Sequence, residues 1–263
     1  MRDQPFPPRL HAEDPAFEIV NPEGDPEILL LCDHASNAVP EEMGTLGLPP
    51  EEFRRHTAYD IGARGATLAL AELLDAPAVL SRFSRLVIDP NRGDDDPTLV
   101  RKISDGAIIP GNRQADAAEA QRRRMRWMSP YHAAITQRVE AALARGVRPK
   151  LLSMHSFTPR MALGPPRPWH VGVLWDHDDG RMALPLMGAL AQEPDLVVGD
   201  NEPYAGRLKG DTMWRHALQR GLAHVVLEIR QDLIGDAAGE RLWAERLAPA
   251  LRLAVESARL GEA

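Results

Sequence analysis

Short apolar runs separated by stretches of helical periodicity are the feature that most constrains how this chain can fold. The clearest run, Ile28–Cys32, is apolar at every position, which is typical of a parallel strand covered by helices on both faces. Similar runs occupy residues 78–80, 86–88, 150–154, 171–175, 196–198 and 225–227. Helical patterns occupy residues 57–75, 114–128, 130–145, 181–193, 211–220 and 237–260. The alternation predicts an α/β domain with three α/β/α layers and a mostly parallel, mixed central sheet.

Nothing in the sequence divides the chain into separate domains. Residues 1–26 are rich in Pro, Asp and Glu and predict an irregular N-terminal arm. Residues 94–111 are rich in Asp and contain Pro and Gly, which favours an excursion from the sheet or a lid. The chain has no internal repeat and no convincing linker, so we predict one domain over residues 1–263.

Composition excludes several classes of function. The formal net charge of -7 disfavours a general nucleic-acid binder, which needs a basic face. No apolar stretch is long enough to span a membrane, and the N-terminal residues lack the apolar core of a signal peptide. The single cysteine, Cys32, cannot form an intramolecular disulfide and fits a reducing compartment. We therefore predict a cytoplasmic protein with no membrane or nucleic-acid partner, and the sequence leaves its oligomeric state open.

Polar residues follow four of the apolar runs, and these are the candidates for chemistry. In open α/β sheets, ligands bind beyond the carboxyl ends of the strands, so side chains from several strand ends are expected to converge there. This convergence is the signal, because no single residue would be convincing alone. The residues are Asp33, His34, Ser36 and Asn37; Asp89, Asn91 and Arg92; His155 and Ser156; and Glu228, Arg230 and Asp232.

Two of these residues, His34 and His155, predict a metal site. Two imidazoles and one carboxylate make a common catalytic zinc site that leaves one position open for water. The third ligand is either Asp60, at the start of the helical pattern that Thr57 is predicted to cap, or Asn37; asparagine is the poorer zinc ligand. Asp33 is better suited to orient an imidazole.

Glu228 is the predicted general base, because it ends a strand run and lies outside the proposed ligand set. Arg92 and Arg230, with Asn91 beside Arg92, are candidates for binding an anionic substrate. The alternative is structural: the histidines could serve only as hydrogen-bonded residues, and Glu228 could only pair with Arg230. The sequence contains no dinucleotide-binding glycine motif, phosphate loop or serine-nucleophile elbow that would indicate another chemistry.

Six segments resemble motifs of the N-formylglutamate amidohydrolase family. The first is Cys-Asp-His-Ala-Ser-Asn-Ala-Val-Pro at Cys32–Pro40, and the matches run in order along the chain. Agreement of six segments, rather than one, makes the resemblance specific. The other segments are Tyr59–Ala63, Ser84–Arg92, Met154–Phe157, Gly199–Tyr204 and Leu227–Ile234.

The resemblance implies a zinc-peptidase-like fold of the phosphorylase/hydrolase type and hydrolysis of an amide bond. The family's namesake releases formate and glutamate from N-formylglutamate in histidine breakdown. The arrangement is also similar to zinc amidases that cut peptidoglycan. It implies His34, Asp60 and His155 as metal ligands, which favours Asp60 over Asn37, and Glu228 as the catalytic residue. Ser156 and Asn201 lie in matching segments and are further predicted substrate contacts.

The sequence thus predicts an amidohydrolase with one zinc ion per chain that acts on a small anionic amide such as an N-acyl amino acid. Water would attack the amide carbonyl, Glu228 would act as base and then acid, and Arg92 would hold the substrate carboxylate. Two other hypotheses remain: a peptide or peptidoglycan amidase on the same site, and a non-catalytic binding protein on the same fold. The acyl group and the amino acid are not predicted.

Overall fold

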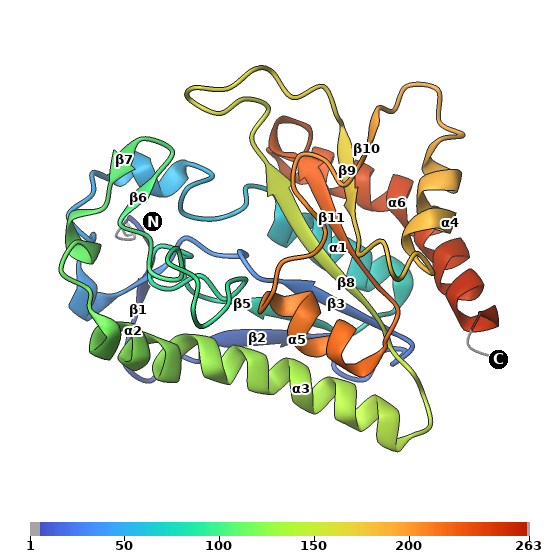
Figure 1. The fold of residues 1–263 in the computed structure, drawn as a ribbon, viewed down its shortest axis with the longest axis horizontal. Coiled ribbons are helices and arrows are strands. Elements are labelled where there is room, and N and C mark those ends of the chain that lie inside the picture. The colour runs from blue at the N-terminus through green and yellow to red at the C-terminus, as the bar shows by residue number, and fades with distance from the viewer. Residues whose placement is uncertain (1–5, 262–263) are drawn as a thin grey trace.

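The computed structural model of the protein describes residues 6–261 and has a seven-stranded sheet at its centre (Figure 1). The strands follow the order β10-β9-β11-β8-β3-β5-β2. Four of the six pairings are parallel, and only β9–β11 and β2–β5 are antiparallel. The predicted α/β fold with a mostly parallel, mixed sheet is therefore confirmed. The strands are β2 (Phe17–Val20), β3 (Ile28–Cys32), β5 (Ala78–Ser81), β8 (Lys150–Phe157), β9 (Val171–Leu174), β10 (Val198–Asp200) and β11 (His224–Arg230).

Helices cover both faces of the sheet and complete the three predicted layers (Figure 1). Alternate residues of β3 show how the faces are divided: Leu30 packs with α1, α4 and α6, whereas Leu29 and Leu31 pack with α3 and α5. Burial on both faces explains why the strand runs are apolar at every position. The helices are α1 (Ala63–Leu74), α4 (Ala183–Leu190) and α6 (Ala237–Leu260) on the first face, and α3 (Ser129–Ala144) and α5 (Thr212–His216) on the second.

Residues 86–88 are the clearest wrong prediction of a strand. Their side chains are fully buried, as the apolar run suggested, but the backbone forms turns instead of pairing with the sheet. Side chains from distant segments replace the missing strand partners: Asn112 Nδ2 donates to the Leu86 carbonyl at 2.8 Å, and Arg123 Nη1 donates to the Val87 carbonyl at 2.9 Å. This segment leads directly into Asp89, which becomes important at the candidate site.

The predicted irregular arm over residues 1–26 is wrong in part. Residues 1–5 lie outside the described part of the chain, but β2 within the arm forms the edge of the central sheet, antiparallel to β5. A shorter strand, β1 (Arg9–Leu10), pairs with β4 (Val39–Pro40) just after the first family-like motif. The arm is therefore part of the domain.

Two predicted helix starts are also wrong. α1 begins at Ala63 instead of near Thr57, because Gly62 adopts a left-handed conformation with φ 77° at the turn before it. A Cβ on Gly62 would lie 1.9 Å from the Ile234 carbonyl oxygen, so only glycine fits there. The second predicted start, at residue 130, is not a separate one, because α2 (Ala117–Arg123) continues through a π-helical turn, Arg124–Met128, into α3.

The remaining elements are short. Residues 94–111, predicted as an excursion or lid, contain a small hairpin of β6 (Ile103–Ser104) and β7 (Ala107–Ile108). Within residues 6–261, no helix combines the length and the apolar character needed to cross a membrane. The 3₁₀ helices are Glu41–Met43, Pro50–Arg54, Pro110–Asn112, Leu218–Arg220 and Gln231–Leu233.

Candidate metal centre

Three buried side chains meet where β3 and β8 approach their carboxyl ends. His34 follows β3, His155 lies in β8, and Asp60 precedes the turn into α1. Asp60 Oδ2 lies 3.2 Å from His34 Nδ1 and 2.8 Å from His155 Nδ1, and each side chain is at most 3% exposed. One ligand atom from each residue lies within 4.8 Å of the others, so the set could hold a metal ion. We call His34, Asp60 and His155 the metal trio.

The strand assignment behind one of these residues needs correction. His155 was predicted to follow its strand, but β8 continues to Phe157 and places His155 inside the sheet. Its polar side chain does not end the strand because buried carboxylates satisfy both ring nitrogens. Asn37, the alternative third ligand, turns elsewhere, and its Nδ2 donates to the Phe53 carbonyl at 2.8 Å.

A second carboxylate holds each imidazole from its far side. His34 Nε2 lies 2.7 Å from Asp89 Oδ1, and His155 Nε2 lies 3.1 Å from Asp33 Oδ2. A neutral imidazole has one N–H. In both rings the carboxylate beside Nε2 accepts from that N–H, which leaves Nδ1 with a lone pair. Carboxylates that orient metal-binding histidines in this way are a common feature of zinc sites. The predicted orienting role of Asp33 agrees with this geometry.

The donor set of the metal trio fits a divalent cation. With both N–H groups on Nε2, two Nδ1 lone pairs and one carboxylate oxygen point at one another, which is favourable only around a positive charge. Two imidazoles with one carboxylate suit zinc. In the metal-free chain, burial acts to lower the pKa of His155, but Asp33 and Asp60 outweigh it and hold that pKa well above its ordinary value.

Asp33 is itself fixed by a network of hydroxyl groups. Thr212 Oγ1 donates to its Oδ1 at 2.5 Å, Tyr131 OH to Oδ1 at 3.0 Å, and Ser153 Oγ to Oδ2 at 2.9 Å. Burial acts to raise the pKa of Asp33, but the hydrogen bond and charge of His155 hold it below its ordinary value. The carboxylate that positions His155 is therefore charged and held by α3, α5 and β8.

Two arginines balance the negative charge of the carboxylates near His34. Arg85 donates from Nη1 to Asp60 Oδ1 at 3.2 Å and from Nη2 to Asp89 Oδ2 at 2.9 Å. Arg101 Nη2 donates to the same Asp89 oxygen at 2.9 Å. Burial and the neighbouring Arg85 lower the pKa of Arg101 to about 10, which still leaves it charged at neutral pH. Arg85 engages Asp60 Oδ1, so Oδ2 is left to face the histidines.

Glu228 lies beside the metal trio on the neighbouring strand. It is paired with His155 in the β11–β8 register, and both side chains point to the α3–α5 face of the sheet. Its side chain is buried, and its Oε2 has no hydrogen-bond partner among the described residues. Burial raises the pKa of Glu228 to about 7; the positive charge of His155 opposes this rise, and the negative charge of Asp60 adds to it. A carboxyl group of this kind can both accept and release a proton near neutral pH.

Replacing Asp89 with asparagine is expected to weaken zinc binding by about 10-fold to 100-fold, because the variant no longer holds His34 Nε2 with a charged acceptor. Competition with a chelator of known affinity measures the zinc dissociation constant. Asp95→Asn is the matched control, because Asp95 lies on the same loop but is exposed and pairs with Lys209. Equal zinc affinity of the two variants would show that Asp89 does not position His34.

Among the predicted substrate contacts, Asn91, Arg92 and Ser156 lie next to residues of the site. Asn91 N donates to Asp89 Oδ1 at 3.0 Å, and Asn91 Oδ1 accepts from Thr212 N at 3.0 Å. Arg92 Nη1 donates to the Asn91 carbonyl at 2.8 Å. Ser156 Oγ donates to the Ile61 carbonyl at 2.7 Å. In this structure, these three residues therefore support the segments that carry Asp89 and Asp60.

Arg230 and Asn201 each contact residues outside the metal trio. Asp232 contacts the Arg230 guanidinium at 2.8 Å. Asn201 Oδ1 accepts from Trp175 N at 2.9 Å, at the carboxyl end of β9. Asn201 was predicted as a substrate contact only from its family-like segment, and in the structure β9 and β10 run opposite to β11. The residue after β10, Asn201, therefore lies at the side of the sheet where β11 begins, opposite to the side where β11 ends.

Sequence reasoning missed several residues that position the trio. Asp89 follows an apolar run and was noted as polar, but nothing in the sequence joined it to His34. Tyr131, Ser153 and Thr212 gave no signal, because their common partner Asp33 is distant in sequence. Only the folded chain brings them together.

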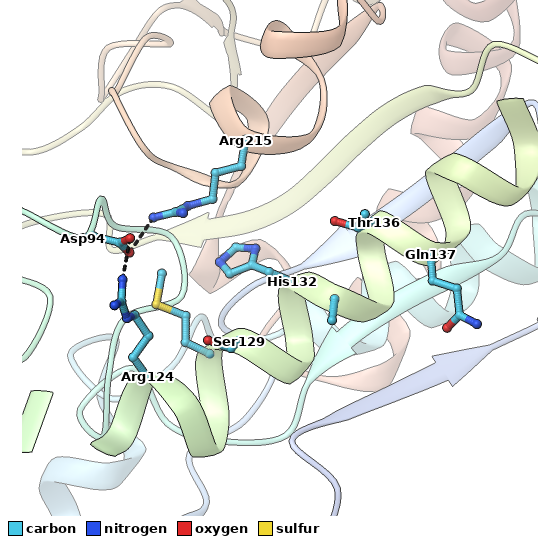
Figure 2. A pocket seen from close by; sticks show the side chains of 9 residues that line it. Asp94, Arg124, Ser129, His132, Thr136, Gln137 and Arg215 are labelled. Atoms are coloured by element: carbon cyan, nitrogen blue, oxygen red, sulfur yellow. Dashed lines mark hydrogen bonds and ion pairs between the residues drawn. The ribbon is translucent and has the colours of Figure 1, made fainter. Parts of the chain in front are cut away.

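A cavity of about 520 Å³ (Figure 2) has none of the metal trio in its lining. In it, Asp94 bridges Arg124 and Arg215. His132 also lines the cavity, and its ring stacks on that of His216 with centroids 5.1 Å apart. The cavity approaches the site only indirectly, since His132 Nε2 lies 3.0 Å from the carbonyl oxygen of Pro90, next to Asp89.

Comparison with known proteins identifies the family of this chain. A crystal structure of a gene product from Agrobacterium tumefaciens is 33% identical, with a TM-score of 0.87 over 96% of this chain and 98% of that one. N-formylglutamate amidohydrolase from Ralstonia eutropha JMP134 is 25% identical, with a TM-score of 0.68 over 94% and 99% of the two chains. No curated protein matches the chain. The N-formylglutamate amidohydrolase family model matches residues 27–235, a span that includes the metal trio and Glu228, and this chain belongs to that family.

Proposed function

We propose that this protein is a zinc-dependent amidohydrolase that cleaves the amide bond of a small anionic N-acyl amino acid, such as N-formylglutamate. The observation that carries the proposal is the placement of Glu228, buried and with a free carboxyl oxygen, beside three convergent metal-ligand atoms. Membership of the N-formylglutamate amidohydrolase family supports the reaction class.

In this proposal, His34 Nδ1, Asp60 Oδ2 and His155 Nδ1 would hold one zinc ion. When bound, zinc lowers the pKa of a coordinated water to about 7 and polarises a carbonyl group. The hydrogen bonds of Asp89 to His34 and of Asp33 to His155 keep both Nδ1 lone pairs directed inward. These contacts reduce the reorganisation needed when the metal binds.

In this proposal, Glu228 acts first as a general base and then as a general acid. Its carboxylate takes a proton from the attacking water as the new bond forms between the water oxygen and the carbonyl carbon. The same carboxyl group then delivers that proton to the leaving nitrogen as the carbon–nitrogen bond breaks. The products are the free acid of the acyl group and the amino acid. A pKa of about 7 suits a group that must both accept and donate the proton.

The predicted substrate contacts of Asn91, Arg92, Ser156, Asn201 and Arg230 remain part of the proposal. Asn91 and Arg92 are the best supported, because they lie two and three residues after Asp89, on the loop that positions His34.

Complete removal of metal by a chelator is expected to abolish amide hydrolysis, and addition of zinc to restore it. The measurement combines metal analysis, with about one zinc per chain expected, and assays with N-formyl and N-acetyl amino acids beside muropeptides. Full activity in metal-free protein would contradict the proposal. Hydrolysis of muropeptides alone would identify a peptidoglycan amidase instead.

A further inference from the structure

A loop on the α3–α5 face of the sheet packs directly against Glu228. After β10 the chain turns back at Asn201, which has φ 51°, and the backbone of Glu202 crosses β9 at Gly172. A Cβ on Gly172 would lie 2.0 Å from the Glu202 carbonyl oxygen and 3.5 Å from Glu228 Cβ. Gly172 is also the register partner of Glu228 on β9. Glycine is therefore required for this close approach, which brings Tyr204 to the side of Glu228.

A second loop, which connects β8 to β9, supplies Arg167 next to Tyr204. Arg167 Nη1 donates to Tyr204 OH at 3.2 Å and to the Thr158 carbonyl at 3.3 Å. The guanidinium carbon lies 5.2 Å from the centre of the Tyr204 ring and 5.8 Å from that of Phe157. The hydrogen bonds of Nη1 and the rings of Tyr204 and Phe157 thus fix the position of the Arg167 guanidinium. Its Nε and Nη2 make no hydrogen bond or ion pair within residues 6–261, so one edge of the guanidinium is available.

The Arg167–Tyr204 pair is in electrostatic contact with the candidate active site. Burial raises the pKa of Tyr204, and the negative charges of Glu228 and Asp60 raise it further. The positive charge of Arg167 is among the influences that oppose the rise in the pKa of Glu228. Together with the crossing of Glu202 at Gly172, these interactions place the pair near Glu228.

We propose that Arg167 and Tyr204 bind a carboxylate of the substrate and so make the enzyme selective for anionic amides, an inference that rests on the proposed function. The planar guanidinium edge matches the two oxygens of a carboxylate. The Tyr204 hydroxyl accepts from Arg167, so its own proton is free for the same carboxylate. An anionic substrate close to Glu228 needs such a cation, because the two negative charges repel each other.

Arg167 offers a freer binding edge than the two arginines predicted from the sequence. Arg230 uses Nε and Nη2 on Asp232, and Arg92 uses Nε on Thr98 and Nη1 on the Asn91 carbonyl. The sequence gave no reason to single out Arg167, because it lies in an irregular loop, ten residues beyond the end of β8.

The test measures how removal of the Arg167 guanidinium changes affinity for ligands with and without each carboxylate. Calorimetry on the zinc-loaded Glu228→Gln protein would compare N-formyl-L-glutamate with its α-amide and its γ-amide. Arg167→Met is expected to weaken N-formyl-L-glutamate by about 10-fold to 100-fold while leaving the affinity of one of the two amides unchanged. That amide identifies the carboxylate that Arg167 binds. Tyr204→Phe is expected to cause a smaller loss, about 2-fold to 10-fold.

Two further variants keep the test interpretable. Arg207→Met is the matched control, because Arg207 lies on the Tyr204 loop but pairs with Asp178; its affinities are expected to equal those of the parent protein. Arg167→Lys keeps the charge without the planar edge and is expected to bind with intermediate affinity. Equal weakening of all three ligands by Arg167→Met, no weakening, or no binding of N-formyl-L-glutamate to the zinc-loaded parent would each overturn the inference.

Hydrolysis by the unmodified protein is measured separately, so the two proposals can fail independently. The expected pattern of affinities without any hydrolysis would leave the inference standing and remove the proposed activity. Hydrolysis without dependence on Arg167 would remove the inference alone.

Discussion

Glu228→Gln is expected to lower kcat for N-acyl amino acid hydrolysis by about 10²-fold to 10⁴-fold while about one zinc per chain remains bound. Glutamine has nearly the same size and cannot take a proton from water or deliver one to the leaving nitrogen. Glu228 is outside the metal trio, so the substitution leaves all three ligand atoms in place. Steady-state kinetics together with metal analysis measure the two effects.

The free energy of unfolding of Glu228→Gln is expected to stay close to that of the parent protein even though activity falls. Glu228 Oε2 is buried without a partner among the described residues, so replacing the carboxyl group breaks no hydrogen bond at that atom. Glu256→Gln on the exposed side of α6 is the control for loss of a carboxylate elsewhere. Activity close to that of the parent protein would remove Glu228 from the mechanism. Loss of zinc together with activity would instead assign Glu228 to the metal site.

Asp60→Asn is expected to remove nearly all bound zinc and, with it, all zinc-dependent hydrolysis. The substitution replaces a charged ligand by a neutral amide, which is a poor zinc ligand. It also breaks the contacts of a buried carboxylate with Arg85 and both histidines, so the free energy of unfolding is expected to fall by about 3 kcal/mol. Metal analysis and denaturant unfolding measure the two losses.

Asn37→Ala is the matched control for Asp60→Asn, because these two residues were the alternative third ligands in the sequence. Asn37 donates to the Phe53 carbonyl and lies outside the metal trio. The control is therefore expected to keep about one zinc per chain. The reverse result, with zinc retained in Asp60→Asn and lost in Asn37→Ala, would show that the ligand assignment is wrong. Circular dichroism establishes that both variants remain folded.

Six of the seven strands of the central sheet could be predicted because each carries its own local signal; β2, in the predicted irregular arm, could not. The run Ile28–Cys32 is β3 with the predicted bounds, and α6 spans the predicted residues Ala237–Leu260. Both depend on local periodicity and burial, which can be read within a short window. The same reasoning failed at residues 86–88, since burial of an apolar run does not specify whether the backbone pairs with a strand or with side chains.

The metal trio could be found from the sequence, but the residues that orient it could not. His34 follows a strand end, where ligands are expected in α/β folds, and the family resemblance favoured Asp60 over Asn37 as the third ligand. The partners of Asp33, by contrast, come from α3, β8 and α5, up to 179 residues away. Such contacts depend on how helices pack over the sheet, and no short sequence pattern encodes them. Strand direction was a further difficulty, because no sequence pattern indicated that β9 and β10 run opposite to β11.

The reversal of β9 also places the loop between β8 and β9 outside the strands and the metal ligands, so that the loop can vary in sequence and length without affecting them. The segment from Thr158 to His170 leaves the sheet at the end of β8 and re-enters at the start of β9, so it departs and returns on one side and passes over the end of β11 (Figure 1). Insertions and deletions in such a loop leave strand order and register intact. The ligands His34, Asp60 and His155 all lie outside it. Under the proposal for Arg167, which lies in this segment, exchange of the segment is expected to change the substrate without moving the three ligands.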